Sequence, residues 1–382
     1  EANQFIAGPA FQAWWLMNNL EGWGGPNSDN WYLQRERLQK QIMKRMKELG
    51  INACLPGYSG MVPHDAKQRL GLNVADPGKW NDYKRPAFLL PTDKRFAEIA
   101  AIYYKEMQKL YGKAQYYSMD PFHEGGNARG VDLGKAGEAI MSAMKAANPK
   151  AVWVAQAWGA CPYPDMIKHL KNGDMLVLDL YSETRPQWGD PESTWLRKEG
   201  FNGHDWAFCM LLNFGGNVGL YGKLQHVVDE YYKARQSKFA STLKGVGLTM
   251  EGIENNPVMY ELVSELPWRN NKFGWQEWLN NYVEARYGNI NNTKVHDAWM
   301  LLARSVYGAS DKVLEQGCHE SVLCARPVLD VYQVSSWSEM EEFYNPDDVI
   351  RAAQLMVEAS HEVKANANFR YDLVDITRQA IA

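Results

Sequence analysis

Two glutamates in this sequence each follow an apolar, strand-like stretch and stand directly before a glycine. Glu124 follows residues 116–123 and precedes two glycines, and Glu251 follows residues 245–250 and precedes one. A glycine at such a point lets the backbone turn sharply and leaves room for another group to approach the carboxylate. Two strand-end carboxylates that are distant in sequence can meet at one face of a sheet or barrel.

A pair of this kind is suited to cleaving a glycosidic bond. One carboxylic acid protonates the leaving oxygen, and a second carboxylate acts as nucleophile or base at the anomeric carbon. We therefore interpret Glu124 and Glu251 as the catalytic pair of a glycosidase. The alternative for each is a glutamate in a salt bridge or a helix cap. The separation of the carboxyl groups, about 5–5.5 Å in retaining and about 6.5–9.5 Å in inverting enzymes, does not follow from sequence.

Two further acidic residues compete with this assignment, and a third stands at a strand end. Glu183 and Glu254 are rivals to Glu251. For Glu254 the alternative role is that of a negative charge which stabilises a helix N-terminus. Asp179 is interpreted as a buried partner at a strand end. His123 would point to the opposite side of the strand from Glu124, and we expect it to support the loop rather than to act as a base.

Aromatic and amide side chains supply candidate sugar contacts. The chain is 12% aromatic, with 15 Trp and 20 Tyr, and sugar rings stack on aromatic faces, although most aromatic side chains serve the core. The candidates for substrate binding, each with ordinary packing as the alternative, are Trp23, Trp158, Tyr181 and Asn213.

Several classes of function find no support in the sequence. The formal charge of −4 gives no reason to expect nucleic-acid binding, and no run approaches the roughly 18 apolar residues of a membrane span. The glycine-rich stretch 215–219 lacks the spacing of a nucleotide-binding loop, and neither GxSxG nor HExxH occurs. No cofactor or metal is expected, because Cys318 and Cys324 have no second ligand pair nearby. Cys54 and Cys209 are expected to be buried thiols.

The chain alternates strands and helices in its first two thirds. Strands are predicted at 52–59, 116–123, 151–158, 175–181, 206–214 and 245–250. Helices are predicted at 28–50, 93–111, 135–147, 164–171 and 221–236, with a loop from 60 to about 91. Six such units favour parallel β/α architecture. After residue 256 the pattern is helical only, at 275–287, 294–307, 346–359 and 369–381. We assign 1–256 to a β/α catalytic domain and 257–382 to an α-helical domain.

Several motifs resemble those of glycoside hydrolase family 89, the α-N-acetylglucosaminidases. They occur in order along essentially the whole chain, at 11–26, 55–60, 122–126, 178–183, 213–217, 250–256 and 370–375. The lysosomal enzyme that trims heparan sulfate belongs to this family, and bacterial members act on α-linked GlcNAc caps of mucin-type glycans. The resemblance implies a (β/α)8 barrel followed by an all-α domain. It also implies metal-free, retaining hydrolysis of terminal α-GlcNAc, with Glu124 as acid/base and Glu251 as nucleophile.

Stereochemistry supports a protein nucleophile for such a substrate. In α-linked GlcNAc the 2-acetamido group lies cis to the leaving oxygen and cannot attack from the opposite face, so a second carboxylate is needed.

The resemblance also implies a fragment, because the first two barrel units and part of the helical domain would lie outside this chain. An open barrel exposes two strand edges. Two other functions therefore stay open, a non-hydrolytic carbohydrate-binding protein and an inactive enzyme fragment. The expected compartment of the protein depends on the source organism: a bacterial protein would be secreted or periplasmic, and an animal protein would be lysosomal.

Overall fold

A computed structural model describes the chain over residues 28–63, 65–76, 78–80, 83–85, 87–123, 126–212, 214, 219–251, 256–288, 292–310, 328–330 and 343–381. Two compact units divide it. The first holds residues 1–179, 187–191 and 195–207, and the second holds residues 180–186, 192–194 and 208–382. Among the described residues, no helix is long and apolar enough to cross a membrane.

One sheet has the strand order β1-β6-β7-β8-β9-β10. The first unit contains β1 (Cys54–Pro56), β6 (Tyr116–Ser118), β7 (Val152–Ala157) and β8 (Met175–Asp179), and their pairings are parallel. β9 (Asp205–Met210) carries the sheet onward, and β10 (Leu243–Leu248) lies in the second unit. Strands that pair in sequence order and in parallel need the intervening helices as crossovers, which confirms the predicted β/α architecture.

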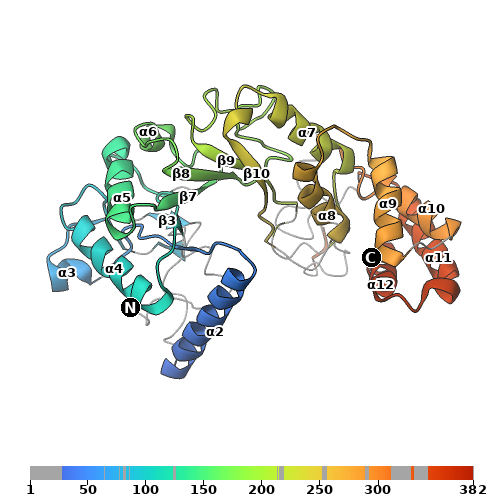
Figure 1. Cartoon of the computed structure of the whole chain (residues 1–382), viewed down its shortest axis with the longest axis horizontal. Helices are drawn as coiled ribbons and strands as arrows, with labels where there is room; N and C mark the ends of the chain where they lie inside the picture. Colours follow the sequence, from blue (N-terminus) through green and yellow to red (C-terminus); the bar gives the residue numbers. More distant parts are fainter. Residues whose placement is uncertain are drawn as a thin grey trace. The chain divides into compact units, whose positions relative to one another are not determined.

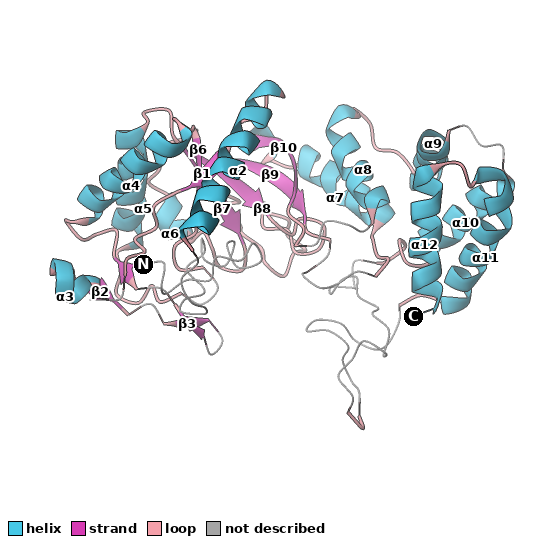
Figure 2. Cartoon of the chain, turned by 90° about the horizontal axis from the view of Figure 1, so that it is seen from below, coloured by secondary structure: helices cyan, strands magenta, loops and turns pink. Residues whose placement is uncertain are grey.

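Helices connect these strands, as Figures 1 and 2 show. α4 (Phe96–Tyr111) and α5 (Leu133–Ala147) pack against each other, and α5 also packs on β7. α6 (Pro164–Ile167) precedes β8, and α7 (Leu224–Gln236) precedes β10. Local signals set their ends. Asp132 accepts a hydrogen bond from the Lys135 amide at the start of α5, and α4 ends at Gly112, whose φ of 82° favours glycine.

The helix α2 (Asp29–Glu48) starts where the sequence predicts. The Ser28 hydroxyl caps it by accepting a hydrogen bond from the Trp31 amide. α2 buries none of its residues, and the leucines and isoleucine of its apolar stripe are exposed.

The second unit is mainly helical after β10. It contains α8 (Pro257–Glu265), α9 (Trp275–Tyr287), α10 (Thr293–Arg304), α11 (Pro346–Val363) and α12 (Ala367–Ile381). α10, α11 and α12 form a packed group with α9 (Figure 1). The apolar side of each of these helices is buried, which confirms the predicted run of amphipathic helices.

Two expectations from the sequence need correction. The segment from 60 to 91 is not only a loop, because it contains α3 (Ala66–Leu70) and two antiparallel ladders. These pair β2 (Val74–Ala75) with β5 (Phe88–Leu89) and β3 (Lys79–Trp80) with β4 (Tyr83–Lys84). Two-residue strands are too short to show the alternation that predicts a strand.

Cys54 is exposed rather than buried, since it lies on β1, an edge strand of the described sheet. An edge strand lacks a neighbour on one side, so an apolar run there does not imply burial. Cys209, on β9, is buried as expected.

Candidate active site

The segment that leads from β6 to Glu124 is held by buried contacts. Asp120 accepts a hydrogen bond from the Gln156 amide on β7, at 2.7 Å, and the Met119 carbonyl accepts one from the Trp153 indole at 2.8 Å. Burial raises the pKa of Asp120 to about 7, while the bond from Gln156 partly opposes the shift. Both contacts fix the end of β6 against β7.

A tight turn follows at Phe122, whose φ of 65° is unusual for a residue other than glycine. Its ring packs edge-to-face on Phe88, and the Gly126 amide closes the turn on the His123 carbonyl. A Cβ at Gly126 would lie 2.5 Å from the Phe122 Cα. The sequence predicts a sharp turn at the glycines, and at Gly126 the structure confirms it.

His123 is fully buried, and among the described residues neither of its ring nitrogens has a hydrogen-bond partner. Burial lowers its pKa to about 4, and the buried guanidinium of Arg85 adds to that shift. The imidazole is therefore neutral at ordinary pH. Its burial agrees with a role in supporting the turn rather than that of a base.

Trp158 and Asp179 lie at the carboxyl ends of β7 and β8. The half-buried Trp158 indole packs edge-to-face on Trp195, with ring centroids 4.8 Å apart. Asp179 is buried and accepts hydrogen bonds from the amides of Gln187 and Trp188, at 2.9 and 3.0 Å. Asp179 thus holds the loop after β8 and is a buried strand-end partner, as expected.

Arg197 extends this network within the same unit. Its guanidinium donates to the Gln187 side chain at 2.6 Å and to the carbonyls of Pro162 and Ala160 at 2.7 and 3.1 Å. Burial lowers its pKa, and the negative charge of Asp179 opposes that shift. The loops after β7 and β8 are joined by these bonds.

Glu183 follows β8 in the sequence and lies in the second unit. One carboxylate oxygen accepts hydrogen bonds from the amides of Leu211 and Leu212, at 3.0 and 2.7 Å, while the other has no hydrogen-bond partner within the described part of the chain. Burial raises the pKa of Glu183 to about 7, and the bonds from the amides and the buried charge of Lys223 oppose the shift. Leu212 has a φ of 62°, so Glu183 stabilises a strained turn directly after β9.

Glu251 follows β10 and is exposed. Two residues earlier, Thr249 donates from its hydroxyl to the Leu180 carbonyl at 2.8 Å, and its amide donates to the Met210 carbonyl at 3.0 Å. These bonds fix the approach to Glu251 against the ends of β8 and β9. Beyond it, the buried side chain of Asn256 accepts from the Tyr221 amide at 3.0 Å and from the Tyr307 hydroxyl at 3.1 Å.

The structure describes only part of the predicted site. Glu251, Trp158 and Tyr181 are described, whereas Glu124, Trp23, Asn213 and Glu254 lie outside the described residues. Tyr181 is buried, and its ring faces Phe214 edge-to-face with centroids 6.1 Å apart. The assignments of catalysis and substrate binding to these residues stay predictions.

Buried polar residues that sequence reasoning passed over make up much of the surrounding network. Asp120, Arg197, Lys223 and Asn256 are all buried. Asp120 could have been identified from the sequence, because it stands within two positions of an apolar strand. Arg197 and Lys223 stand in loops, where no such pattern marks them. Within the described ranges, no group of three or more His, Cys, Asp or Glu side chains could hold a metal ion.

Comparison with known families accounts for nearly the entire chain. Residues 1–270 match the alpha-N-acetylglucosaminidase (NAGLU) tim-barrel domain, and residues 278–382 match the alpha-N-acetylglucosaminidase (NAGLU) C-terminal domain. The human alpha-N-acetylglucosaminidase is 34% identical over 399 residues, which are 100% of this chain and 51% of the human protein. The chain thus spans about half the length of this curated relative.

Solved structures give the same result. The family 89 glycoside hydrolase from Clostridium perfringens, in complexes with 2-acetamido-1,2-dideoxynojirimycin and with PUGNAc, superposes with a TM-score of 0.89 at 32% identity. The match covers 98% of this chain and 42% of the bacterial one. A form of that enzyme with two glutamates replaced by glutamine was solved with its substrate, GlcNAc-alpha-1,4-galactose, and matches equally well.

Proposed function

Because this chain belongs to the α-N-acetylglucosaminidase family of glycoside hydrolases, we propose that it carries the catalytic portion of a retaining exo-glycosidase. The substrate is a glycan with a terminal, non-reducing, α-linked N-acetylglucosamine, of the heparan-sulfate or mucin type. The observation that carries the proposal is the bacterial relative, in which two glutamates were replaced by glutamine in the complex with its substrate. In the sequence of this chain, Glu124 and Glu251 follow the segments of β6 and β10, within the residues that match the barrel domain.

In this mechanism Glu124 is the acid and base, and Glu251 is the nucleophile. Glu251 attacks the anomeric carbon while Glu124 donates its proton to the leaving oxygen, so that a covalent glycosyl-enzyme forms. Glu124, now a carboxylate, takes a proton from water, and the water oxygen displaces Glu251. Two inversions give net retention. Trp23, Trp158, Tyr181 and Asn213 are proposed to contact the sugar.

The described contacts support the accessibility of Glu251. Its side chain is exposed, whereas the rival Glu183 and the strand-end partner Asp179 are buried and accept backbone hydrogen bonds. A nucleophile must reach the anomeric carbon, and a carboxylate engaged with backbone amides serves the fold instead. We therefore favour Glu251 over Glu183.

The test is hydrolysis of an aryl α-N-acetylglucosaminide by four matched glutamate-to-glutamine variants. Glu251→Gln and Glu124→Gln are expected to lower kcat at least about a thousandfold, while the rivals Glu183→Gln and Glu254→Gln retain more activity. Proton NMR of the first product should show α-GlcNAc. Loss in Glu254→Gln alone, or β-GlcNAc as first product, would contradict the assignment.

Azide separates the two roles. With Glu251→Ala, azide attacks in place of the nucleophile and gives a β-glycosyl azide. With Glu124→Ala, it attacks the glycosyl-enzyme and gives an α-glycosyl azide. A folded chain that turns over no substrate would instead favour an inactive fragment or a binding protein.

A further inference from the structure

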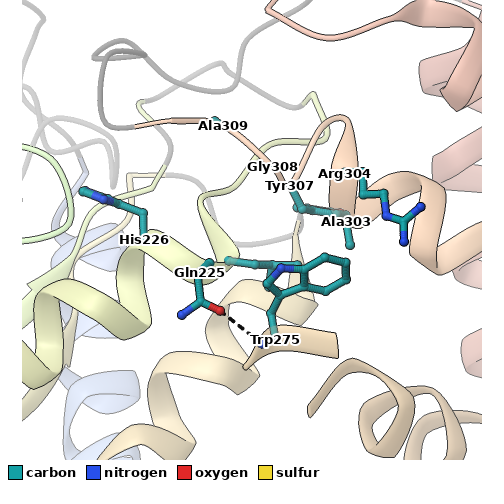
Figure 3. A pocket seen from close by; sticks show the side chains of 9 residues that line it. Gln225, His226, Trp275, Ala303, Arg304, Tyr307, Gly308 and Ala309 are labelled. Carbon is teal, nitrogen blue, oxygen red and sulfur yellow. Dashed lines mark hydrogen bonds between the residues drawn. The ribbon is translucent and has the colours of Figure 1, made fainter. Parts of the chain in front are cut away.

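A hollow of about 270 Å³ lies within the second unit, at a distance in sequence from both glutamates. It is lined by the first turn of α7, the first residue of α9, the last residues of α10 and the turn that follows. Figure 3 shows the Trp275 indole between Gln225 on one side and Arg304 on the other. Its volume is just below the roughly 300–1,000 Å³ of pockets for drug-sized ligands, which suits a single sugar ring.

Hydrogen bonds hold the backbone of Trp275 and the side-chain amide of Gln225. The Gln225 side chain accepts a hydrogen bond from the Trp275 amide at 3.2 Å and donates to Asp229 at 2.7 Å. Trp275 is half-buried, and its indole N–H has no partner among the described residues. An indole that lines the hollow can stack on the C–H face of a pyranose ring.

Arg304 adds an uncommitted donor. It is exposed, and within the described ranges its guanidinium has neither a hydrogen-bond nor an ion-pair partner. A planar guanidinium donates two parallel hydrogen bonds, which fit neighbouring sugar hydroxyls or a carboxylate or sulfate on the sugar. His226 lines the same hollow from α7. An aromatic ring and planar polar side chains therefore line the same hollow.

The wall of this hollow is tied to the segment that carries Glu251. Tyr307 lines it with its ring, stacks on Trp299 at an interplanar angle of 14°, and donates from its hydroxyl to Asn256. Asn256 stands five positions after Glu251 in the sequence and also binds the segment that enters α7, through the Gly219 carbonyl and the Tyr221 amide. One buried side chain thus joins the hollow to the catalytic loop.

We propose that this hollow is an accessory subsite, which binds a sugar residue of the glycan other than the one that is cleaved. The proposal rests on the function proposed above for its substrate class. The sugar ring stacks on Trp275, and its hydroxyls or an acidic substituent bind Arg304 and Gln225. Because none of the described residues that line the hollow is acidic, a bound cation does not compete as an occupant.

The test uses a probe without terminal α-GlcNAc, so that the proposed reaction cannot hydrolyse it. This is a galactose-terminated oligosaccharide, the product left when α-GlcNAc is removed from a GlcNAc-α-1,4-galactose chain. Titration calorimetry should show binding to the chain, weakened about tenfold in Trp275→Ala and less in Trp275→Tyr, which keeps a ring. Arg304→Ala, an exposed change, should also weaken binding. A uronate-bearing oligosaccharide in parallel shows whether Arg304 recognises an acidic sugar.

The matched control is Trp268→Ala, since Trp268 is 86% exposed and does not line the hollow. It should bind the probe as the unaltered chain does. The proposal is wrong if the unaltered chain does not bind either oligosaccharide, or if Trp275→Ala and Arg304→Ala both bind as it does. Aryl glycoside hydrolysis on the same preparations tests the proposed function separately.

Discussion

At the scale of single residues, the buried carboxylates of Glu183 and Asp179 accept hydrogen bonds from backbone amides, whereas Glu251 is exposed. Glu183 and Asp179 each accept two amide hydrogen bonds, and an amide left without an acceptor in the interior costs about 1–3 kcal/mol. Their substitution would disturb the loops after β8 and β9. Glu251 has no comparable place in the core.

Gly126 is the glycine whose substitution tests the turn that carries Glu124. In Gly126→Ala the new Cβ meets the Phe122 backbone, which has to shift because it is no flexible side chain. We expect about 1–3 kcal/mol of destabilisation and at least a tenfold loss of aryl α-N-acetylglucosaminidase activity. Urea unfolding and steady-state kinetics measure the two effects.

Gly130→Ala is the control for the close approach, because Gly130 has a positive φ, of 75°, unlike Gly126, and its Cβ would meet no atom of the described residues within 4 Å. It should cost about 1 kcal/mol and leave activity near that of the unaltered chain. Equal losses of activity in the two variants would contradict the close approach at Gly126.

At the scale of elements, one buried ion pair joins the first and last helices of the C-terminal group. Arg286 on α9 binds both carboxylate oxygens of Asp372 on α12, one at 2.8 Å, and Asp372 also accepts from the Tyr287 hydroxyl at 2.6 Å. The Trp299 indole on α10 donates to that hydroxyl at 2.8 Å. Three helices therefore depend on one carboxylate.

We expect Asp372→Asn to destabilise the chain by about 3–5 kcal/mol, because it leaves the buried Arg286 charge without its counter-ion. The exposed pair between Lys294 and Glu358, at 2.9 Å, is the comparison. Glu358→Gln should leave the urea midpoint almost unchanged, since solvent screens that pair. Similar midpoints for both variants would show that the buried pair does not stabilise the helical group.

At the scale of the whole molecule, stability should depend on pH through buried groups with opposed pKa shifts, which are raised for Asp120 and Glu183 and lowered for His123. The pKa of Asp120 is raised to about 7, so its contribution is present below about pH 4 and is lost as pH rises to 7. The pKa of His123 is lowered to about 4, so its contribution is present above about pH 6.5 and is lost as pH falls to 4. The two dependences partly cancel.

The substitution Asp120→Asn removes the pH dependence that comes from Asp120. Relative to the unaltered chain, the variant should lose about 2–4 kcal/mol of stability as pH falls from 7.5 to 4.5, because protonation of Asp120 no longer offsets that of His123. Urea unfolding of both proteins across this range measures the difference. Parallel profiles would mean that the Asp120 carboxyl titrates normally.

Local patterns were enough to predict most elements. Ser28 before α2, Gly112 after α4 and the apolar runs of β7 to β9 act over a few residues, where capping and hydrophobic periodicity decide the structure. The motifs around the two glutamates pointed to the right family, which the matching barrel and C-terminal domains confirm.

Only the tertiary structure decided which polar residues are buried and what they bind. Glu183, Glu251 and Asp179 look alike in sequence, yet Glu183 and Asp179 are buried and accept hydrogen bonds from loop amides, and Glu251 is exposed. Cys54 is exposed because its strand is an edge, and Trp275 and Arg304 line one hollow although they lie on different helices. Burial and such long-range contacts depend on residues distant in the chain, and no local pattern specifies them.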